Sequence, residues 1–339
     1  MTNQEEAAIP TQTGLGPHGE RPAGSELAQL TPEVCAQALT RGFEVAVLLH
    51  TQASDWSQRQ IAGIRTRLAD AGAHLSEIVD CDYRPDLQIA AVERLVAARP
   101  DAVIAIPVGG TAVADAFRRL SAAGIRLVLL DNVPSGLLPE RDYVSAVSAD
   151  NFRLGQIAAQ LLVPHVPHDG RVCVAAYNVD YFATAQREIA FGKWMRRERP
   201  DIHLDPIKFE APARAGEAVS AYLERGIVPD GFFIVWDEPA VAALPVLATC
   251  RPTPSMTTVD LGSAAARALG EGRILRGVAA QRPFEQGLTA ASAAILSLTG
   301  RSVPPWIVIP GIAVTKDNVA AVYRDVGGTP SAPPRLRER

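Results

Sequence analysis

The chain of 339 residues has few cysteines, no long apolar run and no excess of basic charge. Its four cysteines, Cys35, Cys81, Cys173 and Cys250, are widely spaced and form no CxxC pair, so reduced thiols are expected rather than a disulfide framework. No run approaches the roughly 18 apolar residues of a membrane span, so the protein is not expected to be membrane-embedded. The formal net charge of −4 gives no electrostatic reason to expect nucleic acid as a partner.

Motifs that would carry catalysis or hold a cofactor are also missing. There is no GxSxG nucleophile elbow and no HExxH zinc motif. The segment Gly109–Thr111 could place backbone N–H groups around a phosphate, but it lacks the GxGxxG pattern and the P-loop lysine, which favours a tight turn. His165 and His168 have a spacing that could hold a metal, but without a nearby third ligand a solvated loop is favoured. We therefore expect a protein that is not an enzyme and binds no metal or cofactor.

The two ends of the chain have compositions typical of loose segments. Residues 1–24 are rich in Pro, Gly, Thr and Glu, which predicts disorder. They have neither the basic stretch nor the apolar run of a secretory signal, so no export signal is expected in the chain as written. Within the N-terminal extension, residues 1–42, one helix is predicted over Leu27–Leu39, with Thr31–Glu33 as a cap or internal break. Residues 326–339 are predicted to be a loose tail.

Between Phe43 and Val322 the chain alternates short apolar runs with amphipathic stretches. With 47% hydrophobic and 21% charged residues, the composition is that of a globular protein long enough for two domains. Repeated strand–helix–strand units predict doubly wound parallel sheets of the α/β class, in two series divided near residues 144–149. The predicted strands include Phe43–Leu49, Ser76–Asp80, Ala102–Pro107, Arg126–Asp131, Val144–Ala149, Arg171–Tyr177, Gly231–Trp236, Met256–Leu261 and Leu275–Gln281.

Polar and aromatic residues stand where several of these runs end, which is where ligands bind in open parallel sheets. They are Trp56, Asp131, Asn132, Trp236, Asp237, Asp260 and Gln281. Singly each has a plainer interpretation: Asp237 could cap a helix, and the two tryptophans could belong to the core. Together, indole rings that stack on the C–H faces of a sugar and carboxylates that bind its hydroxyls suit a neutral polyhydroxylated ligand held between two lobes.

The same segments resemble the sugar-binding type I periplasmic binding proteins, the ribose-binding-protein-like group of ABC transporter substrate-binding proteins. The resemblance runs from about Phe43 to Val322, and its motifs follow in the family's order. They are VLLHTQASDWSQRQIAGI, LVLLDN, VSADNFRLGQIAA, FATAQREIAF, FFIVWDEPAVAAL, TTVDLG, VAAQRPFEQG and IPGIAVTKDNV.

The resemblance implies two lobes joined by a hinge with three chain crossings. The N-terminal lobe would comprise residues 43–148 plus 282–310, and the C-terminal lobe residues 149–281 plus 311–325. Carried over by position, the ligand-binding residues would be Ser54, Trp56, Ser57, Asp131 and Asn132 on one side of the cleft, and Arg187, Trp236, Asp237, Asp260 and Gln281 on the other side or at the hinge. Asn132 stands where pentose and hexose binders often have arginine, so ribose is not implied. Trp236 stands where a small amide is common.

The implied function is capture of a sugar or polyol by hinge closure and its delivery to an ABC transporter permease, by a monomeric periplasmic protein. The alternative is a cytoplasmic sugar-responsive sensor that uses the same effector-binding fold, as repressors of the lactose-repressor type do. The missing export signal favours the sensor, whereas the missing helix-turn-helix disfavours it. A mis-assigned start codon would also account for the missing signal, and a sugar-modifying enzyme is the remaining interpretation.

Overall fold

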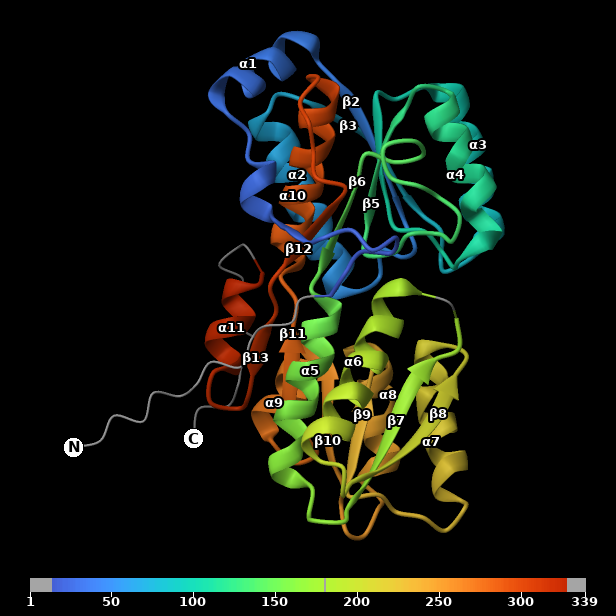
Figure 1. The fold of residues 1–339 in the computed structure, drawn as a ribbon, viewed down its shortest axis with the longest axis vertical. Helices are drawn as coiled ribbons and strands as arrows, with labels where there is room; N and C mark the ends of the chain where they lie inside the picture. The colour runs from blue at the N-terminus through green and yellow to red at the C-terminus, as the bar shows by residue number, and fades with distance from the viewer. Residues whose placement is uncertain (1–13, 180, 328–339) are drawn as a thin grey trace, which may run out of the picture.

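The computed structural model, which describes residues 14–179 and 181–327, consists of two α/β lobes placed one above the other (Figure 1). Each lobe is built on its own sheet. The upper sheet has seven strands in the order β1-β12-β6-β5-β4-β2-β3, and the lower sheet has six in the order β13-β11-β10-β9-β7-β8. Strand orders of this kind require crossover connections, and helices supply them. The prediction of two doubly wound α/β lobes is therefore confirmed.

The upper, N-terminal lobe is a parallel sheet with helices on both faces. Its strands are β1 (Ala23–Gly24), β2 (Glu44–Leu49), β3 (His74–Asp80), β4 (Ala102–Ala105), β5 (Arg126–Leu130), β6 (Ser145–Ala149) and β12 (Trp306–Ile309). Its helices are α1 (Pro32–Arg41), α2 (Asp55–Asp70), α3 (Pro85–Ala98), α4 (Ala114–Ala122) and α10 (Pro283–Leu298). One apolar core lies under α1, α2 and α10 and a second under α3 and α4, which is why the central strands are buried throughout.

The lower, C-terminal lobe has the same construction with one antiparallel edge strand, β13. Its strands are β7 (Arg171–Tyr177), β8 (His203–Phe209), β9 (Gly231–Ile234), β10 (Ser255–Val259), β11 (Leu275–Ala280) and β13 (Ile312–Val314). Its helices are α5 (Asn151–Leu162), α6 (Phe182–Glu198), α7 (Ala215–Leu223), α8 (Asp237–Leu247), α9 (Ser263–Glu271) and α11 (Val319–Asp325). A single apolar core fills it.

The chain passes between the two sheets three times, so neither lobe is continuous in sequence. The passages join β6 to α5, β11 to α10 and β12 to β13. Helix α10 thereby returns to the upper lobe, where it lies beside α2 (Figure 1). The carboxyl ends of β2 and β5 and those of β7, β9 and β10 consequently face the gap between the lobes.

The prediction of disorder for residues 1–24 is wrong for the part that the structure describes. Strand β1 pairs in parallel with β12, with Ala23 opposite Ile307, and extends the upper sheet at its edge. The open edge of β12 offers backbone hydrogen bonds to any sequence that reaches it, which composition does not reveal. Thr31 caps α1, and Ser25–Ala28 forms a separate short 3₁₀ helix. Residues 1–13, and residues 328–339 of the predicted tail, lie outside the described residues.

Candidate ligand-binding site

A cavity of about 320 Å³ lies between the lobes at the carboxyl ends of their strands. The upper lobe contributes the loops after β2, β3 and β5, and the lower lobe contributes the loops after β7, β9 and β10 with the first turns of α6, α8 and α9. Nine of the ten residues predicted for the site line this cavity: Ser54, Trp56, Asp131, Asn132, Arg187, Trp236, Asp237, Asp260 and Gln281.

Ser57, the tenth predicted residue, does not line the cavity. It is fully buried in the first turn of α2, where its backbone N–H donates to Ser54 Oγ at 3.1 Å and its Oγ accepts from the same hydroxyl at 2.9 Å. Ser54 is thus the N-cap of α2, and Ser57 completes the cap. The pair fixes the start of the helix that carries Trp56 into the cavity.

Asp131 follows β5 directly and turns into the cavity through a left-handed backbone conformation, with φ of 53°. Its Oδ1 accepts hydrogen bonds from the Ser148 hydroxyl and the Ala149 N–H, whereas its Oδ2 has no partner among the described residues. Burial raises the pKa of this carboxyl to about 6, against the opposing effects of the Ser148 hydrogen bond and the Arg187 charge. Asp131 therefore holds one buried oxygen that a ligand can satisfy.

Among the described residues that line the cavity, Arg187 is the only arginine or lysine, and hydrogen bonds hold its guanidinium in place. Its Nε donates to Asn151 Oδ1 at 2.8 Å and its Nη1 to the Val235 carbonyl at 3.0 Å. The same Nη1 lies 3.5 Å from Asp260 Oδ2. With 4% exposure, the side chain is held in this orientation by contacts within the protein.

A chain of polar side chains, which we term the hinge network, runs behind the cavity from one lobe to the other. From the upper lobe, Gln60 donates to Gln286 at 3.1 Å, and Gln286 donates to Gln281 at 2.8 Å. Gln281, in the second passage between the lobes, donates to Asp260. The network continues in the order Arg187, Asn151, Ser148 and Asp131, which returns it to the upper lobe.

Asp237 is the first residue of α8, and its Oδ2 accepts a 2.7 Å hydrogen bond from the Gly262 N–H at the start of α9. The carboxylate thus joins two loops of the lower lobe instead of capping its own helix. It is buried and faces other acids, so burial first and then the charge of Asp260 raise its pKa to about 8. The side chain also lines the cavity, as the ligand-contact interpretation of Asp237 requires.

Aromatic rings form much of the cavity wall, and the sequence revealed only two of them. Trp56 comes from the upper lobe and Trp236 from the lower. His50 meets Trp56 edge to face at 5.8 Å, and Tyr177 meets Trp236 edge to face at 5.2 Å. The aromatic lining residues that were not predicted are His50, Tyr83, Tyr177 and Tyr181. Position is a sequence signal for two of them, because His50 directly follows β2 and Tyr177 is the last residue of β7.

The lobes touch each other at the rim of the cavity. The Asp55 carboxylate accepts from the Ser263 N–H at 2.6 Å, and Arg59 donates to the Leu261 carbonyl at 3.0 Å. Asn132 Oδ1 accepts from the Phe182 N–H at 3.0 Å, while its amide nitrogen donates to the carbonyls of Pro107 and Gly109. These contacts are those of a closed arrangement, and they make Asn132 more a lobe-to-lobe link than a free ligand donor.

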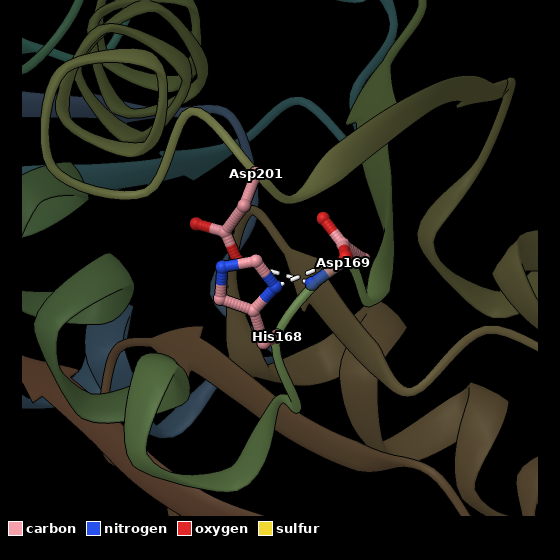
Figure 2. A group of neighbouring side chains, drawn as sticks. All are labelled: His168, Asp169 and Asp201. Carbon is pink, nitrogen blue, oxygen red and sulfur yellow. Dashed lines mark hydrogen bonds and ion pairs between the residues drawn. The ribbon is translucent and has the colours of Figure 1, made fainter.

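His168, Asp169 and Asp201 form a cluster on the surface of the lower lobe, at the amino ends of β7 and β8 and so at the opposite edge from the cavity (Figure 2). Their candidate ligand atoms lie within 4.8 Å of one another. However, Arg199 donates to both oxygens of Asp201, at 2.8 and 2.7 Å, and already supplies the positive charge that a metal would bring. We assign no metal to this cluster.

Among the residues that the structure describes, none of the helices combines the length and hydropathy needed to cross a bilayer.

The fold and cavity define the class: two α/β lobes joined by three passages, with a cavity between the lobes at the hinge. The profile of the periplasmic binding protein domain matches residues 45–302, and the chain belongs to that family. The structure resembles an ABC transporter solute-binding protein from Agrobacterium vitis bound with α-D-tagatopyranose, at 22% identity and a TM-score of 0.76, over 83% of this chain and 98% of that one.

Two further solved structures have the same architecture. One is an ABC transporter solute-binding protein from Mycobacterium smegmatis with bound glycerol, at 21% identity and a TM-score of 0.75, covering 83% of this chain and 96% of that one. The other is a carbohydrate transporter solute-binding protein from Agrobacterium radiobacter in complex with D-arabinose, at 17% identity and a TM-score of 0.73, covering 84% and 97%. A search of curated proteins finds no match.

Proposed function

We propose that the protein is a solute-binding protein that captures a sugar or polyol in the cavity between its lobes and delivers it to an ABC-type importer. The observation that carries the proposal is a set of unpaired polar atoms on side chains that line the cavity. His50 Nδ1, Trp56 Nε1 and Asp131 Oδ2 are buried and have no hydrogen-bond partner among the described residues. Native proteins rarely leave such atoms unpaired, and a ligand with several hydroxyl groups would satisfy them.

The aromatic rings beside these atoms support the same ligand class. Trp56 and Trp236 line the cavity from opposite lobes, and indole rings can stack on the C–H faces of a sugar. A cavity of about 320 Å³ is at the small end of the range for ligand sites, which suits a monosaccharide-sized ligand. The sugars and polyols named for the similar solved structures are of that size and chemistry.

We expect binding without turnover, as the family implies. Asp260, Arg187 and Gln281 bind one another in the hinge network. Closure around the ligand would produce the shape that a permease recognises, and the family places such proteins outside the cytoplasm. The sensor of the lactose-repressor type loses support, because α1 packs its Val34 and Ala38 into the core of the upper lobe instead of forming a separate DNA-binding unit.

The test is calorimetric titration of the purified protein with a panel of pentoses, hexoses, polyols, inositols and sugar phosphates. We expect at least one neutral or amine-bearing sugar or polyol to bind. Arg187→Ala or Asp260→Ala should weaken that binding tenfold or more, because each leaves a buried polar partner unpaired. Asp115→Asn, at an 85% exposed side chain, is the control and should bind as the wild type does. Binding only of phosphorylated sugars would favour the sensor instead.

A further inference from the structure

The cavity wall has more negative than positive groups. Asp131, Asp237 and Asp260 are buried carboxylates, with exposures of 5, 9 and 7%, and Asp55 and Glu238 add two more at the rim. Arg187 is the one lysine or arginine among the lining residues. Burial lowers the pKa of His50, which also lines the cavity, to about 4, so its ring is neutral and supplies no positive charge. Against the effect of burial, Arg59 and Arg267, outside the lining, help to lower the pKa of Asp55 and so compensate that carboxylate. Among the described lining residues, one cation therefore faces the four remaining carboxyl groups.

The positive charge of Arg187 is already paired with a carboxylate of the protein, that of Asp260. Its guanidinium lies against Asp260 and donates to Asn151 and to the Val235 carbonyl. Among the described residues, Asp237 accepts a hydrogen bond only from the Gly262 N–H, through Oδ2, which leaves Oδ1 for a ligand. Two buried carboxyl groups, Asp131 and Asp237, are thus without a cation of their own. A buried carboxylate without a counter-charge is costly, so the ligand is the natural source of the missing charge.

The acids are concentrated at one end of the cavity. Three other acids raise the pKa of Asp237: Asp260, which follows β10; Glu238, the next residue in α8; and Asp55, in the first turn of α2. Trp236 immediately precedes Asp237 in the sequence. Tyr83 lies close enough to Glu238 and Asp260 for their charges to raise its pKa. Aromatic faces attract cations, and an aromatic wall with carboxylates is a favourable environment for an ammonium group.

We propose that the ligand is a sugar or polyol that carries one protonated amine, with the ammonium in the Asp237 corner and the hydroxyl groups toward Asp131 and Gln281. This inference rests on the proposed function and specifies the ligand class. A hydroxyl group can donate a hydrogen bond to Asp237 but does not neutralise the acids around it. An ammonium does both, because it brings up to three donors and a full positive charge.

The proposal has a characteristic pH dependence. Burial and the charge of Asp260 raise the pKa of Asp237 to about 8, so in the ligand-free protein at pH 6 this carboxyl holds its proton. An ammonium binds the ionised form, whose fraction grows about tenfold per pH unit below that pKa. Affinity for an amine that stays protonated over this range, such as a 1-amino-1-deoxyalditol, should therefore rise between pH 6 and pH 8, while affinity for the matching alcohol, which can pair with the protonated acid, should not.

The experiment is titration calorimetry with matched ligand pairs of several stereochemistries. Each pair is an alditol and its 1-amino-1-deoxy derivative, or a hexose and its 2-amino-2-deoxy derivative, and the N-acetylated amines serve as uncharged controls. We expect the amine to bind at least tenfold more tightly than its alcohol at pH 7.5, and the N-acetyl compound to lose this advantage. Asp237→Asn should remove this advantage as well, by weakening the binding of the amine at least tenfold more than the binding of its alcohol; Asp115→Asn is the control variant.

The outcomes separate this inference from the proposed function. Neutral sugars that bind as tightly as their amines, with no selective loss in Asp237→Asn, would overturn the amine proposal and leave the sugar-binding function standing. A panel in which no sugar, polyol or amino derivative binds would overturn the proposed function, and the amine proposal with it.

Discussion

At the scale of single residues, the ionised carboxylate of Asp237 lowers the stability of the ligand-free protein at alkaline pH. Its carboxyl is buried beside Asp260, and its pKa is raised to about 8 from an ordinary value near 4. The folded state binds this proton more tightly than the unfolded chain does. The group therefore contributes to the free energy of unfolding, and the contribution is complete when the pH is below the pKa in the unfolded chain. That contribution is lost as the pH rises through the interval from about 4 to about 8.

Asp237→Asn should therefore stabilise the ligand-free protein at alkaline pH. The amide keeps an acceptor for the Gly262 N–H but cannot ionise beside Asp260. We expect the midpoint of thermal unfolding at pH 8.5 to rise by about 1–2 °C for each kcal/mol gained in the free energy of unfolding, and the difference from wild type to shrink at pH 5. Differential scanning calorimetry at both pH values measures this, and an equal difference at both would contradict it.

The same scale shows which site residues a sequence can reveal. Asp131, Asp260 and Gln281 could be predicted because each directly follows a recognisable apolar strand. Tyr83 and Tyr181 could not, since they lie in loops whose course decides where the rings point. The function of Asn132 as a link to the Phe182 N–H was equally hidden, because it depends on how the lobes meet.

At the scale of elements, the packing of α2 on α10 sets the position of the upper wall of the site. Gly63 and Gly287 let the two helix backbones touch: a Cβ on Gly63 would lie 2.1 Å from the Phe284 carbonyl oxygen, and one on Gly287 would lie 2.1 Å from that of Gln60. Because α2 carries Trp56 and α10 follows Gln281, this contact fixes both ends of the hinge network.

Gly63→Ala should force α2 away from α10. Backbone atoms cannot yield as a flexible side chain can, so we expect a loss of about 1–3 kcal/mol in the free energy of unfolding. Gly192→Ala in α6 is the matched control, since its Cβ would meet only the mobile end of Arg196 at 3.2 Å. Urea denaturation of both variants measures the effect, and equal stabilities of the two would contradict the account.

Helix α10 and strand β8 were not predicted from the sequence, and their burial and composition explain why. Eleven of the sixteen residues of α10 are buried, so it has little polar face and no clear helical period. Strand β8 includes Pro206 and lies at a sheet edge, with mixed exposure. By contrast, β4 and β7 are buried apolar runs, and the structure places them where they were predicted.

At the scale of the whole molecule, contacts between the lobes set the balance between open and closed forms. Arg59 on α2 donates to the Leu261 carbonyl of the lower lobe and lies over the Tyr323 ring at 4.4 Å. It is not among the residues that line the cavity, so its contribution to affinity passes through closure. A ligand that binds the closed form is weakened whenever that form becomes less populated.

Arg59→Ala should shift the ligand-free protein toward the open form. We expect a larger radius of gyration by small-angle X-ray scattering and a ligand affinity lower by about three- to tenfold, mostly through faster dissociation. Saturating ligand should restore the wild-type radius, because binding again favours closure. An unchanged radius together with unchanged affinity would show that this contact does not govern the hinge.

The central claim, a sugar or polyol held between Trp56 and Trp236, is tested most directly by tryptophan fluorescence during titration with the ligand panel. Of the four tryptophans, these two line the cavity. The account predicts a saturable change in emission that is lost in the Trp56→Phe, Trp236→Phe double variant and kept in Trp194→Phe. A saturable change that survives the double variant, or none with any sugar, polyol or amino derivative, would contradict it.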